Sequence, residues 1–118
     1  MTVKIAICTE VGDSTEGVEL AGTLHRFVEN IEVLTCRFDD IFLDSPPRGV
    51  DAAFVCVDNM RALEGARKLH LLGIPMIVLS DSPDYAMEGI RLEVRHYIIR
   101  PLTEPDIRAA LRRLGIPV

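Results

Sequence analysis

Residues 52–57 read AAFVCV, a run of six apolar side chains with no polar residue among them. A short continuous run of this kind is typical of a β-strand that is covered on both faces, as in a parallel sheet. Four other runs favour the same interpretation: VKIAIC at 3–8, EVLTC at 32–36, PMIVLS at 75–80 and HYIIR at 96–100. The sequence therefore predicts five buried strands.

The segments between these strands carry the apolar spacing of helices. Apolar residues recur at helical spacing at Val18, Ala21, Leu24 and Val28, and again at Leu63, Ala66, Leu69 and Leu72. In the last segment, Thr103 is a capping residue, Pro105 falls in the first turn and Gly115 ends the helix. Strands and helices therefore alternate to the end of the sequence.

Such alternation across short connections predicts a parallel sheet that is covered by helices on both faces. We expect one α/β domain over residues 1–118, with a flavodoxin-like five-stranded sheet in the order 2-1-3-4-5. One connection departs from the pattern, because residues 37–49 (RFDDIFLDSPPRG) contain two prolines and three acids. The helix between the second and third strands is therefore expected to be short or absent.

The composition excludes several classes of partner. A chain of 118 residues with a net charge of −5 has room for one core and no electrostatic reason to bind nucleic acid or an anionic membrane. No apolar run reaches the roughly 18 residues of a membrane span, and residues 1–10 lack a signal-peptide core, so we expect a cytoplasmic protein. The widely spaced Cys8, Cys36 and Cys56 favour reduced thiols over disulfides or a zinc site.

In an open parallel sheet, ligands bind beyond the carboxyl ends of the strands. The residues expected at that edge are Thr9 and Glu10, Cys56 and Asp58, Ser80 and Asp81, and Arg100. They combine acids, a hydroxyl and a cation on one rim. Solvated strand ends are often polar for no functional reason, so chemistry alone leaves both interpretations open.

Residues 85–101, YAMEGIRLEVRHYIIRP, resemble a segment of response-regulator receiver domains in the CheY-like superfamily, particularly the LytTR-type subgroup. In that subgroup a Tyr-Ala-aliphatic-Glu helix leads to an aromatic residue, two aliphatic residues and a Lys-Pro pair. The strands at 3–8, 52–57 and 75–80 and the helix from Thr103 are similar as well. The resemblance implies a two-component signalling domain that is not itself an enzyme.

In a receiver, an aspartate accepts a phosphoryl group, acids hold a divalent metal, and a hydroxyl and a lysine bind the phosphoryl oxygens. By resemblance, the acid pair corresponds to Thr9 and Glu10, and the phosphoacceptor corresponds to Cys56. The hydroxyl corresponds to Ser80 and the lysine to Arg100. Tyr97 corresponds to the aromatic residue whose rotation reports phosphorylation in receivers, the switch aromatic. Magnesium would depend on Glu10 and Asp58, and only weakly, because one acid of the pair is lost. Arg100 would pair with Glu10 or Asp58.

These departures favour a degenerate phosphorylation site and a pseudo-receiver that acts by protein contact. Its partner would be a histidine kinase or another signalling protein. The resemblance also implies a homodimer through the fourth strand, its helix, the fifth strand and the last helix. The residues expected to build this face are Tyr85, Ile90, Leu92, Arg91, Arg95 and Arg108.

Two alternatives remain open. A shift of two residues along the third strand preserves its pleat and makes Asp58 the acceptor of a working receiver, phosphorylated by a histidine kinase. Alternatively, CTEVGDST at residues 8–15 is similar to the phosphocysteine loop of phosphotransferase-system IIB proteins, with Cys8 as the carrier.

Overall fold

The sheet has five parallel strands in the order β2-β1-β3-β4-β5, which confirms the predicted fold class. The computed structural model describes residues 2–10, 14–43, 46–85 and 92–118. The strands are β1 (Val3–Thr9), β2 (Ile31–Arg37), β3 (Ala52–Cys56), β4 (Met76–Ser80) and β5 (His96–Ile99). Both β3 and β4 are buried at every position, as their continuous apolar sequences predict.

The helices are α1 (Thr15–Phe27), α2 (Phe38–Phe42), α3 (Met60–Leu71) and α5 (Glu104–Arg113), with a 3₁₀ turn η1 (Pro83–Tyr85) after β4. Helix α2 has only five residues, so the expected short helix between the second and third strands is confirmed. The helix expected to begin at Tyr85 falls mostly on residues 86–91, outside the described residues. None of the described helices is long and apolar enough to cross a membrane.

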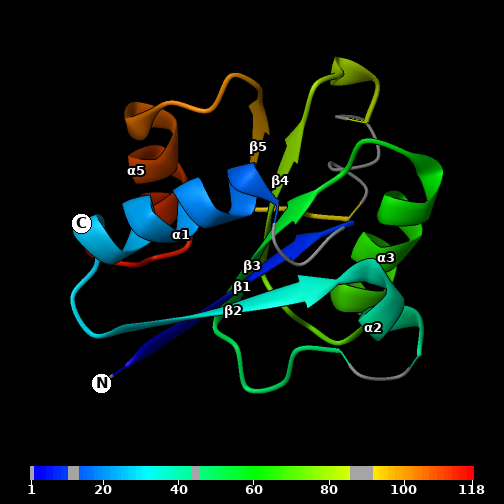
Figure 1. Ribbon diagram of the computed structural model, residues 1–118, viewed down its shortest axis with the longest axis horizontal. Coiled ribbons are helices and arrows are strands. Elements are labelled where there is room, and N and C mark those ends of the chain that lie inside the picture. The colour runs from blue at the N-terminus through cyan, green and yellow to red at the C-terminus, as the bar shows by residue number, and fades with distance from the viewer. Residues whose placement is uncertain (1, 11–13, 44–45, 86–91) are drawn as a thin grey trace.

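The two faces of the sheet are covered by different helix pairs, as Figure 1 shows. Because successive side chains of a strand point to opposite faces, Ile5 and Ile7 pack with α1 and α5, whereas Ala6 and Cys8 pack with α2 and α3. Each face therefore has its own apolar cluster. We call them the α1/α5 core and the α2/α3 core.

A close contact fixes α2 against α3. Phe38 is fully buried at the start of α2, and its ring lies against Gly65 in the middle of α3. A Cβ atom built on Gly65 would lie 2.7 Å from Cδ1 of Phe38, closer than real Cβ atoms approach a neighbour. The absent side chain of Gly65 therefore provides the space that the aromatic ring fills.

Parallel strands bring all their carboxyl ends to one edge of the sheet. The chain leaves β1 at Thr9, β3 at Cys56, β4 at Ser80 and β5 at Ile99, and the predicted polar residues follow these positions. Helix α1 begins at the same edge, because Ser14 caps it by accepting a hydrogen bond from the backbone N–H of Gly17. Side chains from five segments can meet there.

Candidate functional site

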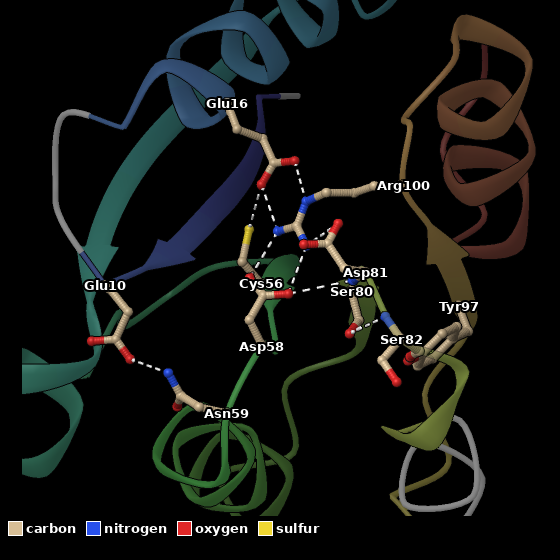
Figure 2. A network of polar contacts seen from close by, with 10 residues as sticks. All are labelled: Glu10, Glu16, Cys56, Asp58, Asn59, Ser80, Asp81, Ser82, Tyr97 and Arg100. Atoms are coloured by element: carbon tan, nitrogen blue, oxygen red, sulfur yellow. Dashed lines mark hydrogen bonds and ion pairs between the residues drawn. The ribbon is translucent and has the colours of Figure 1, made fainter.

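Arg100 lies at the centre of this edge, where it donates hydrogen bonds to two carboxylates and forms a longer ion pair with Asp81, at 3.5 Å (Figure 2). It follows β5 directly. Its Nε donates to Oε2 of Glu16 at 2.5 Å and its Nη2 donates to Oε1 at 2.7 Å. Its Nη1 donates to Oδ1 of Asp58 at 2.6 Å, and Nη2 also reaches Oδ2 at 3.1 Å. We call this group of Arg100, Glu16 and Asp58 the arginine clamp.

The clamp is partly withdrawn from solvent. The side chain of Arg100 is 17% exposed, that of Glu16 30% and that of Asp58 44%. The hydrogen bonds from Arg100 lower the pKa of Glu16, although burial opposes this shift. In return, the hydrogen bonds to Glu16 and then to Asp58 raise the pKa of Arg100 above its ordinary value, so the guanidinium stays charged.

Cys56 contacts the clamp but is a poor nucleophile. Its thiol donates a hydrogen bond to Oε1 of Glu16 at 3.3 Å, and the residue is only 7% exposed. Burial, and then the negative charge of Glu16, raise the pKa of Cys56 to about 12. The position that the resemblance assigns to the phosphoacceptor therefore holds a protonated thiol at neutral pH.

Glu10 is engaged elsewhere. Its carboxylate accepts from Nδ2 of Asn59 at 3.2 Å and from Nη1 of Arg61 at 3.1 Å. Of the two partners expected for Arg100, the structure brings Asp58 to the guanidinium, and it pairs Glu10 with α3 instead. Of the two alternatives, Asp58 is therefore the one that the structure supports, and Glu10 is not the partner because it contacts Arg61 of α3.

Ser80 and Tyr97 are connected by the loop that follows β4. Ser80 is fully buried, and its hydroxyl accepts from the backbone N–H of Ser82 at 3.2 Å. The phenol of Tyr97 donates to the carbonyl oxygen of the same Ser82 at 2.5 Å, while its ring packs against the α2/α3 core. The two positions that the resemblance assigns to phosphate sensing and switching therefore contact one residue.

The clamp opens onto a cavity of about 180 Å³, lined by Thr9, Glu10, Ser14, Glu16, Cys56, Asp58, Asn59 and Arg100. Among the described residues, no group of three or more histidine, cysteine or acidic side chains is placed to hold a metal ion. Asp58, the carboxylate expected to bind magnesium, instead accepts from Arg100, whose positive charge opposes a divalent cation beside it. The described residues therefore do not fit the magnesium site that the resemblance implies.

Glu16 is the member of the clamp that the sequence predictions missed. They considered only the residues directly after each strand, and Glu16 lies in the first turn of α1. A signal was present, because Ser14 is a capping residue and places the helix start at the carboxyl edge of the sheet. An acid two positions beyond that cap lies near this edge, and here it contacts Arg100.

The expected dimer face is only partly described. Ile90 and Arg91 lie outside the described residues. Leu92 was expected to add apolar surface, and this is wrong: it is 8% exposed because it packs into the α2/α3 core. Arg95 is exposed, and the guanidinium of Arg108 lies 4.2 Å from the ring centre of Phe27 on α1.

Comparison with known proteins gives a likeness in structure only. No protein-family model and no curated protein matches the sequence. The response regulatory domain of protein mrkE from Klebsiella pneumoniae is 20% identical, with a TM-score of 0.78 over 96% of this chain and 95% of that chain. A CheY-like receiver domain protein from Methanospirillum hungatei JF-1 is 16% identical, with a TM-score of 0.77 over 98% and 95%.

A putative CpaE2 pilus assembly protein from Sinorhizobium meliloti 1021 is also similar. It is 20% identical, with a TM-score of 0.69 over 95% of this chain and 99% of that chain. At such identities a likeness establishes the fold alone. The chain therefore has the fold of CheY-like response-regulator receiver domains.

Proposed function

We propose that this protein is a cytoplasmic, receiver-like signalling domain, similar to the LytTR-type subgroup, whose degenerate site acts through protein contact without taking up a phosphoryl group. The arginine clamp carries this proposal. Arg100 donates hydrogen bonds to Asp58 and also to Glu16, an acid at none of the positions carried over from the receiver pattern, so the chain's own cation already engages both carboxylates. One internal cation thus offsets part of the negative charge of the site without any ligand.

Two further observations support a role without phosphorylation. The thiol of Cys56 has a pKa of about 12, so it is neither a carboxylate acceptor nor a thiolate at neutral pH. In addition, one similar structure is described as a pilus assembly protein and not as a response regulator. The same fold therefore occurs in a protein whose description names another process.

The proposal is tested by incubating the protein with acetyl phosphate and magnesium and measuring its intact mass. We expect no species that is heavier by one phosphoryl group, because Asp58 is held by Arg100 and the described residues offer no metal site. Asp58→Asn and Cys56→Ala serve as matched variants. A stoichiometric mass gain that disappears in Asp58→Asn and persists in Cys56→Ala contradicts the proposal.

That contradicting result would establish the second candidate, a working receiver that a histidine kinase phosphorylates on Asp58. A specific observation favours it, because Asp58 is the carboxylate that contacts Arg100 directly and its side chain is 44% exposed. The lysine of a receiver is expected beside its acceptor in the same way. What disfavours this candidate is the lack of a metal site among the described residues.

The phosphocysteine alternative has less support. Cys8 is fully buried in the α2/α3 core, whereas a thiol that carries a phosphoryl group must be reached by its donor and acceptor. Residues 11–13 of the corresponding loop lie outside the described residues. A mass gain that is lost only in Cys8→Ala in the same experiment would favour this alternative.

We propose that the partner contact, like the homodimer, uses the face of β4, the helix expected after it, β5 and α5, although residues 86–91 of that helix lie outside the described residues. Ile99 of the edge strand β5 is 46% exposed, and the charged side chain of Arg95 is exposed nearby in sequence. Apolar area flanked by arginine is common at protein interfaces. The partner would be a histidine kinase or another signalling protein.

A further inference from the structure

Cys8 and Cys36 form a pair that the proposed signalling role does not use. In the parallel register of β1 and β2, Cys8 lies directly opposite Cys36. Both side chains point into the α2/α3 core, where Cys8 is 0% and Cys36 5% exposed. The two thiols therefore project from neighbouring strands to the same face of the sheet.

The spacing of the two strands suits a disulfide. Neighbouring strands of a sheet lie about 4.8 Å apart, and the Cα atoms of disulfide-bonded cysteines lie roughly 4.4–6.8 Å apart. Because Cys8 and Cys36 are register partners, their Cα atoms are separated by one strand spacing. A bond between the sulfur atoms therefore needs no change of register.

The two thiols are not equivalent. Cys36 lies on the edge strand β2, one residue before that strand ends, and its Sγ lies 3.5 Å from the carbonyl oxygen of Arg37. The hydrogen bond from Cys8 lowers the pKa of Cys36, although burial and the charge of Asp40 oppose the shift. Cys36 is thus the better nucleophile and the one that local opening of an edge strand would expose first.

We propose that Cys8 and Cys36 are a site of reversible oxidation that forms an intramolecular disulfide on reaction with hydrogen peroxide. The sulfur of Cys36 attacks one peroxide oxygen, the O–O bond breaks, and Cys36 becomes a sulfenic acid while water leaves. The sulfur of Cys8 then attacks the sulfur of Cys36, the S–O bond breaks and a second water leaves. Two thiols lose two electrons and two protons in total, and a dithiol reductant restores them by exchange.

The bond would link two strands that already pair, and the ring that it closes encloses α1. Cys56 provides an internal control, because it lies in the α1/α5 core on the other face of the sheet and its thiol has a pKa of about 12. An oxidation that required only a thiol would modify Cys56 and Cys36 alike. This inference does not depend on the proposed signalling role.

The test exposes the folded, reduced protein to hydrogen peroxide, alkylates the remaining thiols after unfolding and maps the peptides by mass spectrometry. We expect one product that is lighter by two hydrogen atoms, with a peptide containing Cys8 linked to one containing Cys36 and with Cys56 alkylated. Dithiothreitol should reverse the change. Cys56→Ser should form the same link, and Cys36→Ser should not.

Several results would overturn the inference, and the wild-type peptide map alone is sufficient to see them. They are a disulfide that includes Cys56, addition of oxygen to Cys36 without a link to Cys8, and persistence of all three free thiols in folded protein while urea-unfolded protein reacts. None of these outcomes bears on phosphorylation of Asp58, so this inference and the proposed function fail separately.

Discussion

Replacing Arg100 by alanine is expected to lower the free energy of unfolding by about 2 kcal/mol, and the melting temperature by about 8 °C for a domain of this size. The substitution leaves Glu16 and Asp58 without the guanidinium that both contact. Loss of one partner from a fully buried ion pair costs about 3–5 kcal/mol, but these acids are 30% and 44% exposed, so solvent reduces the effect. Thermal and urea unfolding measure it.

Arg26→Ala is the matched control. Arg26 also contacts a glutamate, Glu104, at 2.8 Å, but the two side chains are 62% and 52% exposed. Its loss should cost less than about 0.5 kcal/mol. In a double-mutant cycle, Arg100→Ala and Glu16→Gln should be non-additive by about 1 kcal/mol. Additive effects, with equal losses in the two arginine variants, would show that Arg100 is a solvated cation.

The effect of Arg100→Ala on the melting temperature should also depend on pH. The pKa of Glu16 is lowered in the folded protein, so its stabilising effect is complete above the ordinary carboxyl pKa of 4.5 and is lost as pH falls through the lowered value. The difference in melting temperature between wild type and Arg100→Ala should therefore be constant near neutrality and should shrink below about pH 4.5. A difference that grows in acid would contradict the clamp.

The largest loss of stability is expected at the contact between α2 and α3. Phe38→Ala should cost about 4 kcal/mol, because it removes a fully buried ring and leaves a cavity. Gly65→Ala should also destabilise, by about 1–3 kcal/mol, because the new Cβ would lie 2.7 Å from the same ring. In the Phe38→Ala background, where the ring is absent, Gly65→Ala should instead raise the free energy of unfolding by up to about 1 kcal/mol, because alanine favours helix more than glycine does. Urea unfolding of the two single variants and the double variant measures this reversal of sign.

Gly22→Ala provides the comparison within a helix. Gly22 lies in α1, and a Cβ atom there would meet nothing within 4 Å. The substitution should stabilise the protein by up to about 1 kcal/mol, because alanine favours helix more than glycine does. If Gly65→Ala and Gly22→Ala raised the stability alike, the contact between Phe38 and Gly65 would not be a close one.

The fold could be predicted because its determinants are local in the sequence. An uninterrupted apolar run such as AAFVCV fits a strand that is buried on both faces, and two prolines in residues 37–49 leave room for only a short α2. Right-handed crossovers then leave few possible strand orders. Leu92 shows where this reasoning fails. It precedes β5, and the local sequence does not indicate whether its side chain points to solvent or, as the structure has it, into the α2/α3 core.

The site could be predicted only in part, because contacts between side chains depend on several segments at once. The carboxyl ends of the strands correctly indicated Arg100 and Asp58 as neighbours. The sequence could not decide between Asp58 and Glu10 as the partner, since Arg61, which holds Glu10, lies on another element. Glu16 belongs to a helix whose orientation becomes known only when the sheet is assembled.

The clamp also has a consequence for how the chain is made. Arg100 contacts residues that precede it by 84 and 42 positions, and contacts between such distant segments cost the most chain entropy to form. Synthesis begins at the N-terminus, so Glu16 and Asp58 leave the ribosome well before their shared cation does. Until Arg100 emerges, these two carboxylates have no guanidinium to pair with, so their charge is partly compensated only when the fifth strand and the helix after it arrive.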